Sequence, residues 1–456
     1  MTLMNHNLKD KLKKISSNIS QWIAPGLGIK RWILVVFVGI TTLALGFTVL
    51  ILDIYRETTI TWLRLFFDLI SLSYLARWLR FLIFGGIGLI ILLFGLWELN
   101  HSILKPFVKP GQPFLNTLTD YKKRSKGPRI VAIGGGTGLS ILLRGLKNYT
   151  NNLTAIVTVA DDGGSSGELR RNLGILPPGD IRNCLTALAD DEKMLAQIFK
   201  YRFGERAGVN GHSLGNLFIS ALTDITGSFE EAVAESGRVL AIQGRVLPST
   251  LHDVKLVAEI LIPNEGKEVK VVGESEITHL NGTITHLWLE PSNPLPFPPT
   301  VQAILNADLI VIGPGSLFTS VLPNLLVPGL AEAIKASKAL KFFISNVANQ
   351  KGETQDFKTS DHIEVIEKHL NNTHFDVVIC NNDLSSLKND KIELVVPDAD
   401  LEEQHSVYFA PLVHSKNPWR HDPLLLAEVI NDLYFERTGP LMIDKSDHSQ
   451  NGSVLG

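Results

Sequence analysis

The sequence predicts an α/β protein, a doubly wound sheet preceded by a transmembrane hairpin of two helices. Two stretches predict the sheet. Ile130 to Arg144 and Ala307 to Ser316 each place a short run of β-forming residues before a glycine-rich turn, and a helical pattern follows each turn. Two long uncharged runs near the N-terminus predict the hairpin, because such runs can cross a bilayer.

Composition and charge narrow the class of protein. The 456 residues suffice for more than one domain, and the formal net charge of −3 gives no indication of a nucleic-acid partner. Cys184 and Cys380 are the only cysteines, so the chain has no disulfide framework. The soluble part is therefore expected in a reducing, cytoplasmic compartment.

The N-terminal part is predicted to hold two membrane spans. A basic lead-in precedes an uncharged run from Ile33 to Leu52, which matches the roughly 20 residues that cross a bilayer. A second uncharged run, Phe81 to Trp97, is shorter but still able to span. The first run is too long and begins too late for a cleaved signal peptide. A buried core hairpin is the alternative.

Basic residues flank both spans and predict their orientation. Lysine and arginine outnumber acids before the first span and after the second, so both ends of the hairpin are expected on the cytoplasmic side of the plasma membrane. The soluble domain would then be cytoplasmic. The connector from Asp53 to Arg80 predicts an amphipathic helix, either at the outer interface or packed on the hairpin.

The first glycine-rich loop follows the run Ile130 to Ile133. Its glycines tolerate positive φ and a close ligand, and the helix after it offers unpaired N–H groups and a positive dipole end. An anion, usually a phosphate, suits such a turn, although a tight connection without ligand has the same pattern. The candidate ligand-binding residues are Gly134, Gly135, Gly136, Thr137 and Gly138.

A second strand, Leu153 to Ala160, ends in an acidic glycine loop. Successive strands that both end in such loops are typical of the ligand edge of a doubly wound sheet. Asp161 and Asp162 are suited to hold Mg²⁺, to accept hydrogen bonds from sugar hydroxyls, or to cap the next helix, and these roles stay open. The candidates are Asp161, Asp162, Gly163, Gly164, Ser165 and Ser166, with the two aspartates as candidate metal ligands.

Residues 168–240 predict mostly helices. Asp180 follows a proline-rich turn and is expected to cap the next helix. His212 and Asn216 lie four residues apart and share a helix face if that helix begins early. No acid stands at the spacing of a metal site or a catalytic triad, so His212 is either a binding residue or a packed histidine.

The loop after Ile312 repeats the arrangement of the first glycine loop. Pro314 fixes its own φ and lacks an N–H. The N–H groups of Gly315, Ser316 and Leu317 are expected to be free, and such a loop is suited to phosphate. The candidates are Gly313, Gly315, Ser316 and Thr319, the last two as hydroxyl donors.

The remaining segments predict further strands and helices. Three strand signals between Gln243 and Glu290 predict a β-rich extension of the sheet. Ala339 to Ser345 and Phe375 to Cys380 predict two more strands, and Leu424 to Tyr434 a helix. The predicted domains are a lead-in (1–31), the hairpin (32–100), a linker (101–127), the α/β domain (128–440) and a polar tail (441–456).

Four blocks of this sequence resemble the YvcK/CofD family: IVAIGGGTGLSILLRGLK, VTVADDGGSSGELRRNLGILPPGDIRNCL, GHSLGNLFISAL and ADLIVIGPGSLFTSVLPNLLVPGLAEAI. With GETQDF and DHIEVIEKH behind them, the resemblance covers about residues 130 to 370. The match is closer to the YvcK branch, the gluconeogenesis factors, than to the CofD branch. Ala348 to Lys351 departs from the family pattern, and that segment is not carried over as a site.

The resemblance implies a Rossmann-like three-layer core with a helical insertion. YvcK-type proteins bind UDP-N-acetylglucosamine and related UDP-sugars and are linked to cell shape and envelope synthesis on gluconeogenic carbon sources. The resemblance thus implies a UDP-sugar-binding regulator, here anchored to the membrane by a hairpin outside the usual family pattern. The resemblance is also compatible with a homodimer and with an envelope-synthesis protein as a partner. The blocks add Asp180, Arg182, Asn183 and Asn324 as candidate ligand-binding residues.

Two enzyme classes are the alternatives. CofD-type proteins transfer a 2-phospholactyl group from a guanosine-diphosphate-activated donor to a deazaflavin. The first alternative is therefore a 2-phospho-L-lactate transferase-like enzyme with Mg²⁺ as cofactor. An NAD-dependent oxidoreductase is disfavoured, because GGGTG lacks the G-x-G-x-x-G spacing and DDGGSSG stands where a lone acid is expected. No obvious general base or nucleophile is present, which favours binding, although phosphoryl-type transfer can run on positioning and a metal.

Overall fold

The computed structural model describes residues 29–55, 72, 74–104, 123–190, 192–204, 211–262, 266–280, 282–384 and 392–439. The chain divides into two units, Met1–Asp120 and Tyr121–Gly456, and each is described by itself. The predicted lead-in up to residue 28, most of the amphipathic connector, the linker from 105 to 122 and the polar tail lie outside the described residues.

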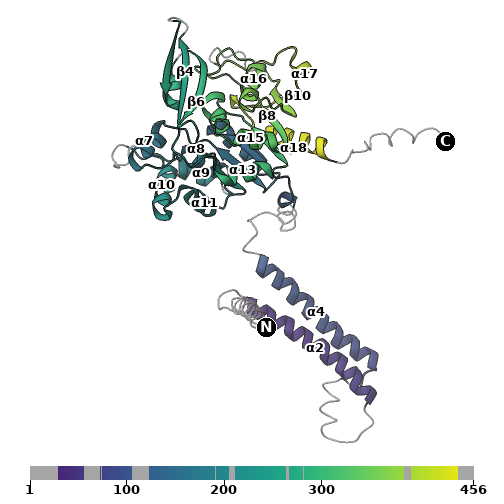
Figure 1. The fold of residues 1–456 in the computed structure, drawn as a ribbon. Coiled ribbons are helices and arrows are strands. Elements are labelled where there is room, and N and C mark those ends of the chain that lie inside the picture. The colour runs from purple at the N-terminus through teal and green to yellow at the C-terminus, as the bar shows by residue number, and fades with distance from the viewer. Residues whose placement is uncertain are drawn as a thin grey trace, which may run out of the picture. The chain divides into compact units, whose positions relative to one another are not determined.

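The described part of the first unit is a pair of helices, α2 (Ile29–Tyr55) and α4 (Arg77–Leu104), packed side by side (Figure 1). Glycines let the backbones approach, because a Cβ on Gly39 would lie 2.9 Å from the backbone nitrogen of Leu92. Among the described residues, one helix, Arg77–Glu98, is long and apolar enough to cross a membrane, and the apolar part of the other, Leu34–Val49, is shorter. The pair of helices is confirmed, and its insertion into a bilayer stays a prediction.

The second unit is built on a seven-stranded sheet in the order β10–β9–β8–β7–β1–β2–β3. Every neighbouring pair of strands in it runs parallel, which confirms the predicted α/β sheet. All residues of β1, β2, β7 and β9 are buried, as expected of strands covered on both faces. The strands are β1 (Ile130–Gly134), β2 (Leu153–Val157), β3 (Arg245–Pro248), β7 (Leu309–Ile312), β8 (Leu340–Ile344), β9 (Val377–Asn381) and β10 (Val407–Ala410).

The strand order reverses between β1 and β7. The chain runs outward from β1 to β2 and β3, then returns to place β7 on the other side of β1 and continues to β10. In doubly wound sheets, ligands bind at such a reversal, in the crevice beyond the carboxyl ends of the strands. The two strands that meet here are the ones that end in the two glycine loops.

Helices pack on the sheet in two groups. One contains α6 (Gly136–Leu146), which packs against α8 (Gly179–Leu188) and α18 (Pro423–Thr438), and the other contains α13 (Pro298–Leu305) and α15 (Leu330–Ala336). The connections from β1 to β3 and those from β7 to β10 run across the sheet in opposite directions. Because such crossovers are right-handed, the two groups of helices lie on opposite faces of the sheet. The helical insertion between β2 and β3 also comprises α7 (Gly164–Leu173), α9 (Glu192–Lys200), α10 (Leu214–Thr226) and α11 (Phe229–Val239), as predicted for residues 168–240.

The β-rich segment differs from the prediction. β4 (Lys255–Ile262), β5 (Lys267–Val272) and β6 (Thr283–Glu290) form a separate antiparallel sheet instead of extending the main one, and β4 and β6 project from the unit in Figure 1. Short connections favour antiparallel pairing, because a parallel neighbour needs a crossover. The end of the second predicted strand is a helix, α12 (Glu274–His279). The other elements are η3 (Leu317–Val321), α14 (Leu322–Leu325), α16 (Thr359–His369), α17 (Leu401–Gln404), β11 (Val413–His414) and β12 (Asn417–His421).

Candidate functional site

A cavity of about 760 Å³ lies where β1 and β7 end, and it is named the switch-point cavity here. Eight predicted site residues line it, from both glycine loops, the acidic loop and the start of α8: Gly135, Gly136, Thr137, Gly138, Asp161, Asp180, Gly315 and Ser316. The remaining candidates lie outside its lining: Gly134, Asp162, Gly163, Gly164, Ser165, Ser166, Arg182, Asn183, His212, Asn216, Gly313, Thr319 and Asn324. The fold therefore brings the two glycine loops together but places much of the helical insertion elsewhere.

The two glycine loops touch each other. A Cβ on Gly138 would lie 2.3 Å from the carbonyl oxygen of Pro314, a separation that real Cβ atoms do not show. Behind the loops, the buried amide of Asn324 donates to the carbonyl oxygens of Gly134 at 3.0 Å and Ser320 at 2.8 Å. Asn324 thus ties the end of β1 to η3 and lies outside the lining of the cavity.

A carboxylate of the chain occupies the start of α6. Asp180 Oδ2 accepts a hydrogen bond of 2.6 Å from the N–H of Gly136, one of the groups predicted to meet a phosphate. Burial and, to a lesser extent, nearby Asp161 raise the pKa of Asp180 to about 7, against the opposing effects of the Gly136 N–H and Arg182. The expected capping role of Asp180 is wrong, because α8 begins at Gly179 with no side-chain cap. The carboxylate instead accepts the N–H of Gly136 in the neighbouring loop.

A second carboxylate meets the helix after the other loop. The hydroxyl of Thr319 donates to Glu353 Oε1 at 3.0 Å, and Glu353 is 5% exposed. Burial raises the pKa of Glu353 to about 7, against the hydrogen bonds from Thr319 and from the backbone N–H of Phe318. Both helix starts that were predicted to hold phosphate are therefore met by an acid of the chain itself.

Only some of the N–H groups that were predicted to be free in the GPGS loop are free. The N–H of Gly315 donates to Asn346 Oδ1 at 3.1 Å, and Asn346 Nδ2 donates back to the Gly315 carbonyl at 2.8 Å. The prediction that the Gly315 N–H is free is wrong, because a side chain from the end of β8 pairs with that peptide. In the part of the chain that the structure describes, the N–H groups of Ser316 and Leu317 have no acceptor.

The two aspartates of the acidic loop have different surroundings. Asp161 lines the cavity, its Oδ1 accepts from the Gly163 N–H at 2.8 Å, and burial raises its pKa. Asp162 Oδ1 instead accepts from the N–H of Ser275 at 3.0 Å and from its hydroxyl at 2.5 Å. Asp162 thereby ties the loop to the start of α12, and a role in ligand binding stays a prediction.

Three carboxyl groups converge on one side of the cavity. Burial raises the pKa of Glu274 well above its usual range, and Asp161 and Asp180 raise it further. Carboxylates suit Mg²⁺, so the charges fit a hard cation. However, Asp161 and Asp180 already accept backbone hydrogen bonds, and the described residues contain no group of three or more His, Cys, Asp or Glu side chains placed to hold an ion. The negative charge of Asp161, Asp180 and Glu274 thus suits a metal ion, but these side chains are not placed to coordinate one.

Five predicted residues meet in a buried network of the helical insertion. The hydroxyl of Ser165 bonds His212 Nδ1 at 3.0 Å and accepts from Asn216 Nδ2 at 3.0 Å. Arg182 donates to Asn216 Oδ1 at 2.9 Å and to Asn183 Oδ1 at 2.9 Å. This network holds α7, α8 and α10 together, so His212 is packed among its neighbours, and its role as a ligand-binding residue stays a prediction.

Sequence reasoning missed the part of the cavity wall that comes from β12 and from the segment after β8. Trp419, Arg420 and His421 come from β12, and further lining residues follow β8. His421 is 4% exposed, and burial lowers its pKa to about 4, so its ring is neutral at pH 7. The one feature of the sequence that could have indicated this wall is the succession of Trp419, Arg420 and His421, which offers an aromatic ring, a guanidinium group and an imidazole ring. The residues that follow β8 are Asn346, Val347, Ala348, Asn349 and Gln350, and the last three belong to the segment that the resemblance did not carry over.

Comparisons with known proteins agree with this architecture. The model of the family described as 2-phospho-L-lactate transferase CofD matches residues 130–412. The gluconeogenesis factor of Bacillus subtilis is 44% identical over 318 residues, which are 68% of this chain and 99% of that protein. A relative from Deinococcus radiodurans is 34% identical over 430 residues, 91% of this chain and 89% of its own.

A solved structure extends the comparison to three dimensions. The crystal structure of a UPF0052 family protein from Bacillus halodurans has 42% sequence identity and a TM-score of 0.62, and the match covers 67% of this chain and 99% of that one. The part matched in both Bacillus proteins is nearly the whole of each. The chain therefore belongs to the CofD/UPF0052 family, as one of its gluconeogenesis factors.

Proposed function

We propose that this gluconeogenesis factor binds a nucleotide sugar of the UDP-N-acetylglucosamine type in the switch-point cavity and acts as a regulator. The observation that carries the proposal is a pair of buried polar atoms, Asn349 Oδ1 and His421 Nε2. Both residues line the cavity, and neither atom has a hydrogen-bond partner among the described residues. Buried polar groups are normally paired, so a ligand rich in hydroxyl and amide groups suits this wall.

Other groups at the cavity suit the remaining parts of such a ligand. The unpaired N–H groups of Ser316 and Leu317 are at the start of a helix and suit a phosphate. Arg420 adds a guanidinium group, and Trp419, which is 46% exposed, offers a ring for a base to stack on. A volume of about 760 Å³ lies within the usual range of small-molecule sites.

Membrane anchoring is the second part of the proposal. The helices α2 and α4 would form a two-span hairpin with both ends on the cytoplasmic side of the plasma membrane. The match to the Deinococcus radiodurans relative is too long to be confined to the α/β unit, which supports a shared N-terminal part. A reporter fused at residue 116 should be cytoplasmic and one near Thr58 external. Recovery of the full chain in the soluble fraction without detergent would refute the hairpin.

A ligand panel tests the cavity. The full chain in uncharged detergent is titrated with UDP-N-acetylglucosamine, GDP and NAD, each with and without Mg²⁺. Thermal unfolding is measured at each ligand concentration. The UDP-sugar should stabilise most, by about 2.7 kcal/mol when present at about 100 times its dissociation constant. Stabilisation by GDP that requires Mg²⁺ would favour the transferase alternative, which the charges of Asp161, Asp180 and Glu274 suit although their placement among the described residues does not form a metal site.

Gly315→Val asks whether the GPGS loop holds the phosphate. A Cβ there would meet nothing nearer than 3.6 Å, but the φ of Gly315 is +159°, which strains any side chain, so the fold of the variant is checked first by its heat unfolding. The methyl groups of the valine would enter the space beside the two loops. We expect loss of UDP-sugar binding. Gly204→Val is the matched control, because no described atom lies within 4 Å of its Cβ position. A folded Gly315→Val variant that binds as the parent does would move the phosphate to another loop.

A further inference from the structure

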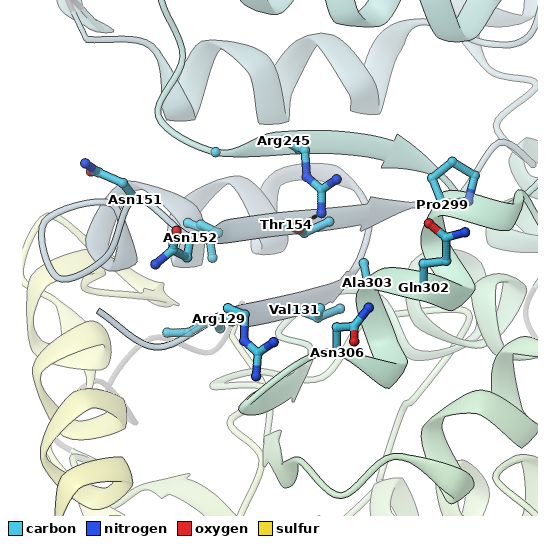
Figure 2. Close-up of a pocket in the computed structure, with 13 residues that line it drawn as sticks. Arg129, Val131, Asn151, Asn152, Thr154, Arg245, Pro299, Gln302, Ala303 and Asn306 are labelled. Atoms are coloured by element: carbon cyan, nitrogen blue, oxygen red, sulfur yellow. Dashed lines mark hydrogen bonds between the residues drawn. The ribbon is translucent and has the colours of Figure 1, made fainter. Parts of the chain in front are cut away.

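A second cavity, of about 480 Å³, lies at the amino ends of β1, β2 and β3 (Figure 2). Strand register places Val131, Thr154 and Arg245 in one row across the three strands. Alternate residues of a strand share a face, so Arg129 and Asn152 belong to the same side of the sheet. The helix α13 borders this part of the sheet face, with Pro299 and Gln302 beside the cavity in Figure 2.

The lining of this cavity has positive charge and no negative charge. Its charged members are Arg129 and Arg245, and no aspartate or glutamate belongs to it. Four side-chain amides complete the polar part, contributed by Asn151, Asn152, Gln302 and Asn306. A concave surface of guanidinium and amide groups without a carboxylate favours an anionic ligand that also carries hydroxyl groups.

The guanidinium groups of Arg129 and Arg245 differ in their hydrogen bonds and ion pairs. Arg129 donates to Asp308 at 2.6 Å and 3.1 Å, and its backbone N–H donates to the same carboxylate at 2.8 Å. Arg245 has one hydrogen bond, of 3.3 Å to the hydroxyl of Thr154, and within the described residues it has no ion pair. Figure 2 shows Arg245 directed at Thr154 on the neighbouring strand. Arg245 is therefore a cation whose charge nothing in this cavity balances.

We propose that this cavity is a second ligand site, which binds a small phosphate-bearing molecule through Arg245. A guanidinium group binds phosphate through two parallel hydrogen bonds, which its single long bond to Thr154 leaves available. The amides of Gln302 and Asn306 are placed to bind hydroxyl groups of the same molecule. Because β1 and β2 separate this cavity from the glycine loops, the site is distinct from the switch-point cavity and independent of the function proposed for it.

Two sources can supply that phosphate, a soluble phosphorylated metabolite or a lipid headgroup. The segment before β1 carries exposed Lys123 and Lys126. The amide of Asn152 donates to the carbonyl oxygens of Ser125 at 3.2 Å and Gly127 at 2.8 Å, which fixes that basic segment beside the cavity. The recognition chemistry is the same for both sources, so the experiment has to separate them.

Calorimetric titration of the full chain in uncharged detergent tests the site with two probes. Glycerol 3-phosphate represents the soluble source, and dihexanoyl phosphatidic acid, a short-chain lipid that stays in solution, represents the headgroup. We expect at least one to bind saturably, and Arg245→Gln to weaken that binding about tenfold or more, as loss of a charged hydrogen-bond donor does. Tighter binding of the lipid probe would assign the site to a headgroup, and tighter binding of glycerol 3-phosphate to a metabolite.

Arg238→Gln is the matched control, because it removes the same charge from α11 at a residue outside the cavity that pairs with Glu235. It should leave both titrations unchanged. A second variant, Gln302→Leu, should also weaken binding while keeping all charges. The proposal is overturned if neither probe binds the parent, or if Arg238→Gln and Arg245→Gln weaken binding equally, since the effect would then be general charge attraction. Binding of the UDP-sugar should be the same in all three variants.

Discussion

The two ends of the main sheet treat the same chemical group in opposite ways. At the carboxyl ends, Asp180 is buried and its pKa rises to about 7, although it accepts a hydrogen bond from a helix start. At the amino ends, Asp308 is partly exposed, and its hydrogen bonds with Arg129 hold its pKa below the usual value. Loss of hydration dominates at one end, and an ion pair dominates at the other.

Parallel strands explain why the difference is so complete. All seven carboxyl ends meet at one edge, so their loops form one crevice in which several acids lose water together. The amino ends meet at the other edge, where a free guanidinium and an ion pair remain near solvent. Ligand chemistry can therefore differ between the two edges while the strands between them are shared. The following variants break or sharpen this contrast, from the largest expected effect to the smallest.

Gly138→Ala should have the largest effect, because it forces apart the two loops that form the crevice. The new methyl group would lie 2.3 Å from the carbonyl oxygen of Pro314, which is backbone and cannot turn away. We expect a loss of about 3 kcal/mol or more in the free energy of unfolding, measured by urea denaturation. Gly204→Ala, in open space, should change it by less than about 0.5 kcal/mol. Equal stability of the two variants would show that the loops do not touch.

Asp180→Asn should change how stability depends on pH. A folded-state pKa raised to about 7 means that this group stabilises the protein fully below its unfolded pKa of about 4, and that the stabilisation is lost as the pH rises through 7. The asparagine keeps an acceptor for the Gly136 N–H but cannot ionise. The variant should therefore lose less stability between these pH values and exceed the parent above pH 7, as measured by urea midpoints.

Glu353 supplies the control for that titration. Its pKa is also raised to about 7 by burial, so part of the pH dependence should remain in Asp180→Asn and decrease further when Glu353→Gln is added. Asp161 and Glu274, whose pKa values burial also raises, account for what is left. Parallel pH profiles for the parent and both variants would mean that neither Asp180 nor Glu353 titrates in this range.

Trp419→Ala should weaken ligand binding without affecting the fold. The side chain is 46% exposed and lines the switch-point cavity, so its removal leaves no buried gap. If the base of a nucleotide stacks on it, we expect a loss of about 1–3 kcal/mol in the binding of UDP-N-acetylglucosamine, measured by calorimetry. Trp97→Ala, in the helix pair, serves as the comparison and should leave the affinity unchanged. Unaltered binding in Trp419→Ala would place the base elsewhere in the cavity.

Asp308→Asn should have the smallest effect, because its ion pair is partly exposed. A lowered folded-state pKa means that the carboxylate stabilises the protein above its unfolded pKa and that this is lost as the pH falls through the folded value. We expect a cost of at most about 1 kcal/mol at pH 7, from urea denaturation, and convergence with the parent in acid. A constant difference at all pH values would point to packing instead of charge.

Local chemistry explains which parts of this protein could be predicted from the sequence. The strands Ile130–Gly134 and Leu309–Ile312 are runs of apolar β-formers followed by glycines, and the helices α2 and α4 each contain a continuous uncharged run. Each of these runs lies within about 20 neighbouring residues, where periodicity and glycine chemistry operate. The same reasoning placed Gly135, Gly138 and Ser316 at the crevice, because the carboxyl ends of parallel strands meet at one edge.

Tertiary structure decided which groups meet those loops. Asp180 reaches Gly136 across 44 positions, Glu353 reaches Thr319 across 34, and Asp162 reaches Ser275 across 113. No spacing in the sequence encodes such contacts, since they depend on which strands and helices become neighbours. For the same reason, the strand signals of β4 to β6 did not reveal a separate sheet, and Trp419 to His421 did not reveal a cavity wall. Sequence pattern determines the elements, and long-range packing determines the partners that their polar groups find.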